Sequence, residues 1–431
     1  MNSIQKNIAE KPMSKYQIFI VFLCFLMNFN DGIDILLMSF SGSMMMEDLG
    51  INNTELGYLF SSGLAGMTLG CLFIAPIGDR IGRKKIFIYS FLLICAGLYG
   101  VALLNDYALI LISRFLTGLG IGGILPTLTS TASEYANDKR RDFLVGFIQA
   151  GWPIGAILTG LVAAAILPNL GWQIAFLIAA LFSTFILILI LIYFENSIEF
   201  SLLNPHLVDV SKFNLQLKRM DLDPVVEIPA VKRVSQKIGL KDLLSPEERI
   251  NTLKLWIAAF FGFITLYTLM SWVPKIAEEN GLAFQLATYV GITLNIGAAI
   301  GSSSIGAIGY KFGLKRVQLI FMLLGFAVMQ YFSQASLNTF LIFLLIFLGG
   351  IFVQGGFNGI WPILSRVYAS EKRNTGIGFT VGFGRFGAVF GPMIFGYLRD
   401  QDWSSQTLFM IFSLPLLLMG GFIYSLKSKN L

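Results

Sequence analysis

The chain has 431 residues, of which 55% are hydrophobic and only 13% are charged. Soluble domains carry about 25% charged residues, so this composition excludes an ordinary water-soluble protein. The net charge of +6 would suggest nucleic acid in a soluble chain, but here the basic residues follow a membrane topology, which indicates a lipid bilayer and no nucleic acid as partner.

Twelve apolar runs are long enough to cross a bilayer, which takes about 20 residues. Six precede a polar stretch and six follow it, near residues 16–40, 54–78, 86–104, 107–134, 142–166, 171–194, 252–274, 285–309, 317–336, 338–366, 375–398 and 404–426. The polar stretch, residues 195–251, reads as a cytoplasmic linker. The sequence therefore predicts an all-α membrane protein of 12 transmembrane helices, with one six-helix bundle in residues 1–194 and another in residues 252–431.

The lysine and arginine residues predict the orientation of these spans. If the N-terminus is cytoplasmic, 27 of the 31 lie in segments on the cytoplasmic side, and the exceptions are Arg114, Lys275, Arg385 and Arg399. Basic residues concentrate on the cytoplasmic side of membrane proteins, so we expect both termini there. The composition and the lack of a removable signal peptide favour a bacterial inner membrane.

The two halves of the chain repeat each other. IGDRIGRKK (77–85) corresponds to IGYKFGLKR (308–316), and YANDKR (135–140) corresponds to YASEKR (368–373). Two six-helix repeats joined by a loop are typical of transporters in which one half rocks against the other, with the substrate site between them near the membrane midplane.

The stretch GDRIGRKK resembles the loop after the second helix of the major facilitator superfamily. The resemblance implies the major facilitator fold and a conformational latch at the cytoplasmic helix ends. The candidate latch residues are Asp79, Arg80, Gly82, Arg83 and Glu134. Ala75 and Tyr310 depart from the usual pattern, and we therefore expect the latch to be stronger in the N-terminal half.

Further stretches resemble the aromatic acid:proton symporters of this superfamily. They are DGID (31–34), RFLTGLGIGGILP (114–126), YTLMSWVP (267–274) and GFGRFGAVFGP (382–392). The resemblance implies that Asp31, Asp34, Arg114 and Arg385 are signature residues, and it indicates a carboxylate substrate.

The charges within the spans point the same way independently of any family. Only Asp31 and Asp34, of 25 acidic residues, lie well within a predicted span, and the single histidine, His206, lies in the linker. Two acids three residues apart share a helix face and cannot both ionise cheaply in a poorly solvated cavity. If transport is proton-driven, this pair must carry the proton, and Asp31 is favoured because it is deeper. The alternative is that both face an aqueous vestibule or bind loose amides near Gly32.

Arg385 is placed near the membrane midplane, where it could bind an anionic substrate, or helix carbonyls in a purely structural role. Arg114 lies less deep in the membrane, and its role is open: it could pair with the acids or bind substrate. Further candidates for substrate contact are the polar residues Gln149, Asn295, Gln354 and Asn358, which could equally be interhelical hydrogen bonds, and the aromatic residues Tyr267 and Trp361.

The sequence therefore predicts a monomeric, proton-coupled importer of a small organic carboxylate, with an aromatic acid favoured, without cofactor or metal. Other cargoes (nicotinate, a dicarboxylate, a siderophore) and drug export are the nearest alternatives. A lone midplane arginine suits a neutral sugar poorly. The sequence lacks residues with the spacing of an enzyme active site, a metal site or a phosphate loop, which argues against a membrane enzyme. The linker is too short to contain the signalling domain of a receptor.

Overall fold

The computed structural model describes residues 3–229, 240–246, 248–334, 338–368 and 372–427, and these contain helices but no β-strand. The helices are α1 (Ser3–Glu10), α2 (Lys15–Leu49), α3 (Asn53–Leu69), α4 (Gly78–Ile81), α5 (Arg83–Leu103), α6 (Tyr107–Tyr135), α7 (Arg141–Gln149), α8 (Gly151–Tyr193), α9 (Ile198–Leu203), α10 (Val210–Arg219), α11 (Leu240–Leu243), α12 (Arg249–Glu279), α13 (Phe284–Phe312), α14 (Leu314–Gln334), α15 (Thr339–Gly349), α16 (Gly355–Asn358), α17 (Ile360–Val367), α18 (Arg373–Asp400) and α19 (Ser405–Tyr424). Short π-helical or 3-10 turns are η1 (Gly70–Ile74), η2 (Ala75–Ile77), η3 (Pro205–Leu207) and η4 (Gly350–Gln354).

Eleven helical stretches in the described ranges are long and apolar enough to cross a membrane. One of them, Phe143–Tyr193, has 51 residues and contains a break at Gly171, where φ is 77°. Because this stretch is long enough for two crossings, the structure contains twelve spans. The predicted twelve-helix fold is confirmed.

The first span is longer than its apolar run, which ends near residue 40. Helix α2 begins at a capping box formed by Ser14 and Gln17 and continues to Leu49. It ends at Gly50, whose φ of 63° is a left-handed conformation that glycine adopts without steric cost. The helix therefore ends where a C-cap is available, and not where its side chains turn polar.

The backbone carries the repeat that the motifs predicted. Outside the linker, every described residue with a positive φ belongs to a pair separated by 231 positions. The pairs are Gly50 with Gly281, Gly82 with Gly313, and Gly171 with Asp402. The two halves thus turn at equivalent places although few side chains are shared.

Glycines bring the helices of each half close together. A side chain at Gly32 of α2 would overlap the Trp152 carbonyl of α8, and one at Gly387 of α18 would overlap the Phe260 carbonyl of α12. Small residues allow such backbone approach in membrane proteins, where lipid removes the hydrophobic drive for helix association.

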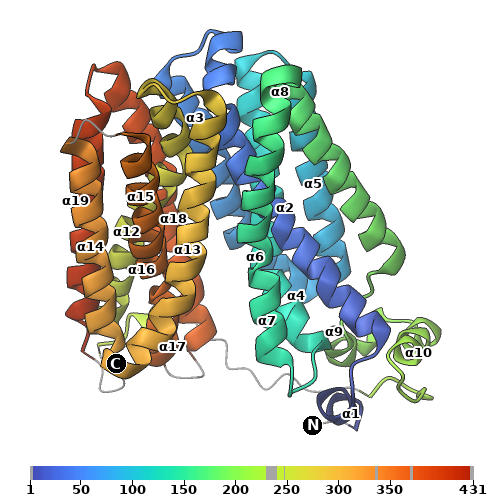
Figure 1. Cartoon of the computed structure of the whole chain (residues 1–431). Helices are drawn as coiled ribbons and strands as arrows, with labels where there is room; N and C mark the ends of the chain where they lie inside the picture. Colours follow the sequence, from blue (N-terminus) through green and yellow to red (C-terminus); the bar gives the residue numbers. More distant parts are fainter. Residues whose placement is uncertain (1–2, 230–239, 247, 335–337, 369–371, 428–431) are drawn as a thin grey trace.

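Two groups of helices are visible in Figure 1, α2–α8 (the N-terminal group) and α12–α19 (the C-terminal group), and they converge at the end opposite the two termini. All hydrogen bonds found between described residues of the two groups lie in the half of the molecule near that end. For example, Asp400 accepts bonds from the Asn53 and Thr54 backbone amides at 3.1 and 2.6 Å. We call this the closed end.

The first part of the linker packs on the N-terminal group at the other end. The Asn196 side chain accepts a hydrogen bond from the Lys84 amide at 3.1 Å and lies against Gly82. Gln216 of α10 donates to the Asn196 carbonyl at 2.8 Å and to the Tyr135 hydroxyl at 3.0 Å. The equivalent Gly313 has no neighbour within 4 Å of its missing side chain among the described atoms.

This difference predicts unequal effects of one substitution at two equivalent glycines. Gly82→Ala and Gly313→Ala both place alanine at a positive φ, which costs roughly 1–3 kcal/mol, but only the first collides with Asn196. We expect the purified Gly82→Ala protein to unfold at the lower temperature, and the gap to shrink when Asn196 is also replaced by alanine. Equal unfolding temperatures would show that Asn196 does not brace this loop.

Candidate functional site

A buried ion pair lies within the N-terminal group. Arg114 of α6 binds both carboxylate oxygens of Asp34 of α2, with Nη2 3.2 Å from Oδ2 and Nη1 in contact with Oδ1. Both side chains are 3% exposed. Such a two-fold contact is the strongest geometry for a guanidinium and a carboxylate. Of the two roles open to Arg114, pairing with a helix acid is the one that the structure displays.

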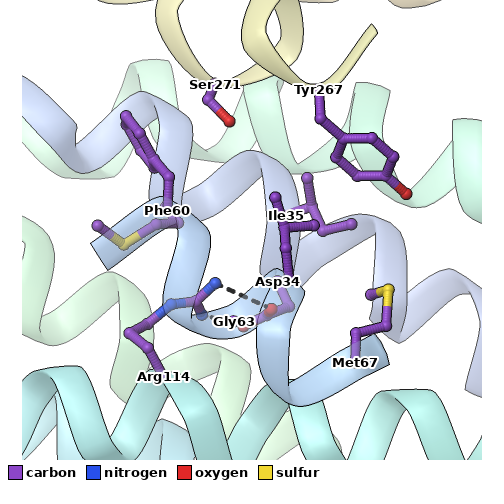
Figure 2. A pocket seen from close by; sticks show the side chains of 10 residues that line it. Asp34, Ile35, Phe60, Gly63, Met67, Arg114, Tyr267 and Ser271 are labelled. Atoms are coloured by element: carbon purple, nitrogen blue, oxygen red, sulfur yellow. Dashed lines mark hydrogen bonds and ion pairs between the residues drawn. The ribbon is translucent and has the colours of Figure 1, made fainter. Parts of the chain in front are cut away.

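A small cavity of about 20 Å³ adjoins this pair, large enough for one water molecule. Figure 2 shows Asp34 and Arg114 on one side of the cavity and Tyr267 and Ser271 on the other. The last two residues come from α12, so the cavity lies at the boundary between the two groups of helices. Ser271 was not predicted from the sequence, although it follows Tyr267 by one helical turn.

Asp31 lies one turn before Asp34 on α2 but has different surroundings. Its side chain is buried, with 5% of the residue exposed, and Oδ1 has no hydrogen-bond partner among the described residues. Its charged neighbours are Arg385, which attracts it, and Asp34, which repels it. Asp31 is thus the less completely paired of the two acids.

Arg385 of α18 is the cation of the C-terminal group that attracts Asp31, although the two do not form an ion pair. It is 7% exposed, and neither Nε nor Nη1 has a hydrogen-bond partner in the described part of the chain. The Tyr267 hydroxyl and the Cys71 thiol are further neighbours of the guanidinium. Buried charges are normally paired and fully hydrogen-bonded, so two free donors on a buried cation favour an additional anion.

Cys71 was also not predicted, because a lone cysteine in an apolar run carries no signal of its own. It lies in η1, which directly follows α3, four residues after Met67, which lines the cavity.

The other predicted contact residues lie on α7, α13 and the irregular α15–α17 segment. Asn295 is buried and donates to its own helix at Gly291, while Asn358 donates to Ser302 at 2.7 Å. Gln354 is partly buried, Gln149 is exposed, and Trp361 is 40% exposed. Their roles in binding stay predictions.

Part of the predicted latch is visible at the end where the termini lie. Arg83 contacts Glu134 at 3.2 Å, and Gly82 forms the turn before it. The side chains of Asp79 and Arg80 lie outside the described part of the structure, so their roles also stay predictions.

The Arg114–Asp34 pair predicts a strongly non-additive effect on stability. Removing one partner by Arg114→Met or Asp34→Leu leaves the other charge buried and should cost about 3–5 kcal/mol, whereas the double variant should recover much of that loss. Denaturation in detergent micelles would measure the free energy of unfolding. The exposed Arg141–Asp138 pair is a matched control and should contribute at most about 1 kcal/mol. Additive losses at Arg114 and Asp34 would contradict a tightly coupled pair.

Comparison with known proteins agrees with this architecture. The sequence model described as the Major Facilitator Superfamily matches residues 18–302 and 255–429. The 4-hydroxybenzoate transporter PcaK of Acinetobacter baylyi is 29% identical over 416 residues, with 95% of this chain and 91% of that protein covered. The gallate transporter of Pseudomonas putida is 28% identical over 420 residues, with coverages of 95% and 91%.

Among solved structures, a D-xylose-proton symporter superposes with a TM-score of 0.78 at 17% identity, covering 96% of this chain and 99% of the other, and so shares the fold. The resemblance to aromatic acid transporters that the motifs indicated is confirmed along nearly the whole chain. The chain belongs to the Major Facilitator Superfamily and is a membrane transporter, not an enzyme.

Proposed function

We propose that this protein imports a small aromatic carboxylate together with protons, by alternating access between two rocking bundles, residues 1–194 and 252–431. One observation carries the proposal: Arg385 is a buried cation with two donor nitrogens that have no partner in the described part of the chain, and its guanidinium attracts Asp31 of the other bundle without forming an ion pair with it. Relatives that transport 4-hydroxybenzoate and gallate support an aromatic acid as cargo.

The cargo carboxylate binds the Arg385 guanidinium. Arginine stays charged and presents a planar fork of donors that matches a carboxylate, so a neutral cargo would leave its free donors unsatisfied. Tyr267 is next to the guanidinium and offers an aromatic face to a ring. Gln149, Asn295, Gln354, Asn358 and Trp361 are the further candidates for contacts to the cargo, and Arg114 acts indirectly by holding Asp34.

The proton binds Asp31. Asp34 is already neutralised by Arg114, whereas Asp31 depends on the same Arg385 that the cargo needs. When Asp31 is ionised, two carboxylates compete for one guanidinium. When Asp31 is protonated, the guanidinium is released to the cargo, and the loaded site has one negative charge fewer to carry across the membrane.

The protein is proposed to lie in a bacterial inner membrane as a monomer with both termini in the cytoplasm, as the distribution of basic residues indicates. The closed end then faces outward. In this orientation Asp79, Arg80, Gly82, Arg83 and Glu134 lie at the cytoplasmic end, where they act as the latch.

Two substitutions separate the roles of the acid and the cation. Asp31→Asn should abolish accumulation driven by a pH gradient but retain exchange of labelled for unlabelled cargo, because asparagine resembles the protonated acid. Arg385→Ala should lose both activities, because the anion site is gone. Uptake and counterflow in proteoliposomes would measure the two activities.

Arg399→Ala is the matched control, because this arginine is on the same helix but pairs with Glu279 near the protein surface. It should keep both activities. Normal pH-driven accumulation by Asp31→Asn would reject the proton assignment, and retained counterflow by Arg385→Ala would reject the anion site.

The cargo is identified by a thermal-shift screen of purified protein with 4-hydroxybenzoate, gallate, nicotinate, succinate and a neutral sugar at several pH values. Stabilisation by the aromatic acids that is absent in Arg385→Ala is expected. Niacin transporters are also among the relatives, so stabilisation by nicotinate alone would redirect the proposal to that cargo.

A further inference from the structure

Two serines of the N-terminal group donate hydrogen bonds to backbone carbonyls of the C-terminal group. The Ser39 hydroxyl on α2 lies 2.7 Å from the Met270 carbonyl oxygen and 3.0 Å from that of Ser271, both on α12. The Ser61 hydroxyl on α3 donates to the Val389 carbonyl on α18 at 2.7 Å. Both serines are buried, with 2% and 4% exposed.

One of these carbonyls is free to accept because its helix contains a proline. Pro274 of α12 has no N–H, so the Met270 carbonyl four residues earlier has lost its donor within the helix. Pro392 of α18 removes the donor of the Ala388 carbonyl in the same way, next to the Val389 carbonyl that accepts from Ser61. In both helices the carbonyl three residues before the proline accepts a serine hydroxyl from the opposite group.

These hydrogen bonds lie next to the charged site. Ser271 lines the cavity beside Asp34 and Arg114, and its carbonyl is one of the acceptors. Trp272 connects the two proline regions, since its indole nitrogen donates to the Pro392 carbonyl at 3.2 Å, and its ring packs edge-on against Phe60 of the N-terminal group at 5.4 Å. Ser39 therefore bonds to the backbone of a residue in the cavity wall, and Ser61 follows Phe60, which also lines the cavity.

We infer that Ser39 and Ser61 are positioning residues that set the balance between the two openings of the transporter. This inference rests on the proposed alternating access. The donors and acceptors belong to different bundles, so both bonds form when the closed end is shut and break when it opens. Water replaces the lost partners in the open state, and each bond therefore contributes the modest net stability of an ordinary hydrogen bond.

Sided labelling tests this inference without any cargo. Cys24, Cys71 and Cys95 are replaced by alanine, a reporter cysteine is placed at Ile35 in the cavity wall, and a membrane-impermeant maleimide is applied from outside. Ser39→Ala and Ser61→Ala should each raise the labelling rate about twofold to tenfold. The double variant should show roughly the product of the two effects, because both act on one equilibrium.

Ser41→Ala is the matched control. Ser41 lies on the same helix as Ser39 and is fully buried, but its hydroxyl has no hydrogen-bond partner in the described ranges. Labelling in this variant should match the parent. If Ser39→Ala is labelled no faster than Ser41→Ala while its unfolding temperature falls, the serine bond is merely structural and the inference is overturned.

A transport measurement provides an independent readout. A larger outward-open population lowers the KM for external cargo by up to the same factor, since apparent affinity scales with the competent fraction. We expect Ser39→Ala to lower the external KM and, because reclosing is impaired, to lower kcat as well. A labelling change without any transport would leave this inference standing while rejecting the proposed cargo or coupling.

Discussion

An incompletely paired charge inside a membrane protein is the constraint on which the rest of this structure depends. Ionisable residues within spans are costly and are usually paired or functional. Here Asp34 and Arg114 form an ion pair within one group of helices, whereas Asp31 and Arg385 attract each other across the boundary between the groups without forming one. Under the proposed alternating access only the second arrangement changes, so the charges that lack an ion pair are also the ones that the movement affects.

Irregular backbone positions the groups around these charges. Cys71 lies in the π-helical turn η1 and Gln354 ends the π-helical turn η4, and π-helical turns within α-helices frequently mark functional sites because they redirect side chains. Pro274 of α12 leaves the Met270 carbonyl free for a hydroxyl of the opposite group, and on α18 the Val389 carbonyl, three residues before Pro392, accepts another. Glycines such as Gly32 allow close packing of the helices within each group. Glycine and proline, which weaken the helices of soluble proteins, thus lie here at contacts within each group and next to the boundary between the groups.

The sequence was sufficient to predict the twelve spans and the repeat, because hydropathy and motif spacing are properties of single segments. It also isolated Asp31, Asp34, Arg114 and Arg385, because charges are rare in apolar runs.

The partner of Arg114 could not be predicted, since it depends on the rotation of α6 relative to α2. The hydrogen bonds of Ser39 and Ser61 could not be predicted for a different reason. Their acceptors are backbone carbonyls, which every residue type has, so the sequence does not distinguish them. Gly82 and Gly313 are equivalent in the repeat, yet only the folded linker places Asn196 beside the first of them.

The arrangement of one cation between two anions also determines the sign of coupling under the proposed function. If ionised Asp31 and the cargo carboxylate compete for Arg385, protonation of Asp31 strengthens cargo binding, and by linkage cargo binding strengthens protonation by the same factor. Proton and cargo then favour each other on the protein and cross together. An exchanger needs the opposite arrangement, in which a cationic cargo and the proton compete for one carboxylate. A buried arginine facing the acid from the other bundle therefore favours symport of an anion, whatever the identity of its ring.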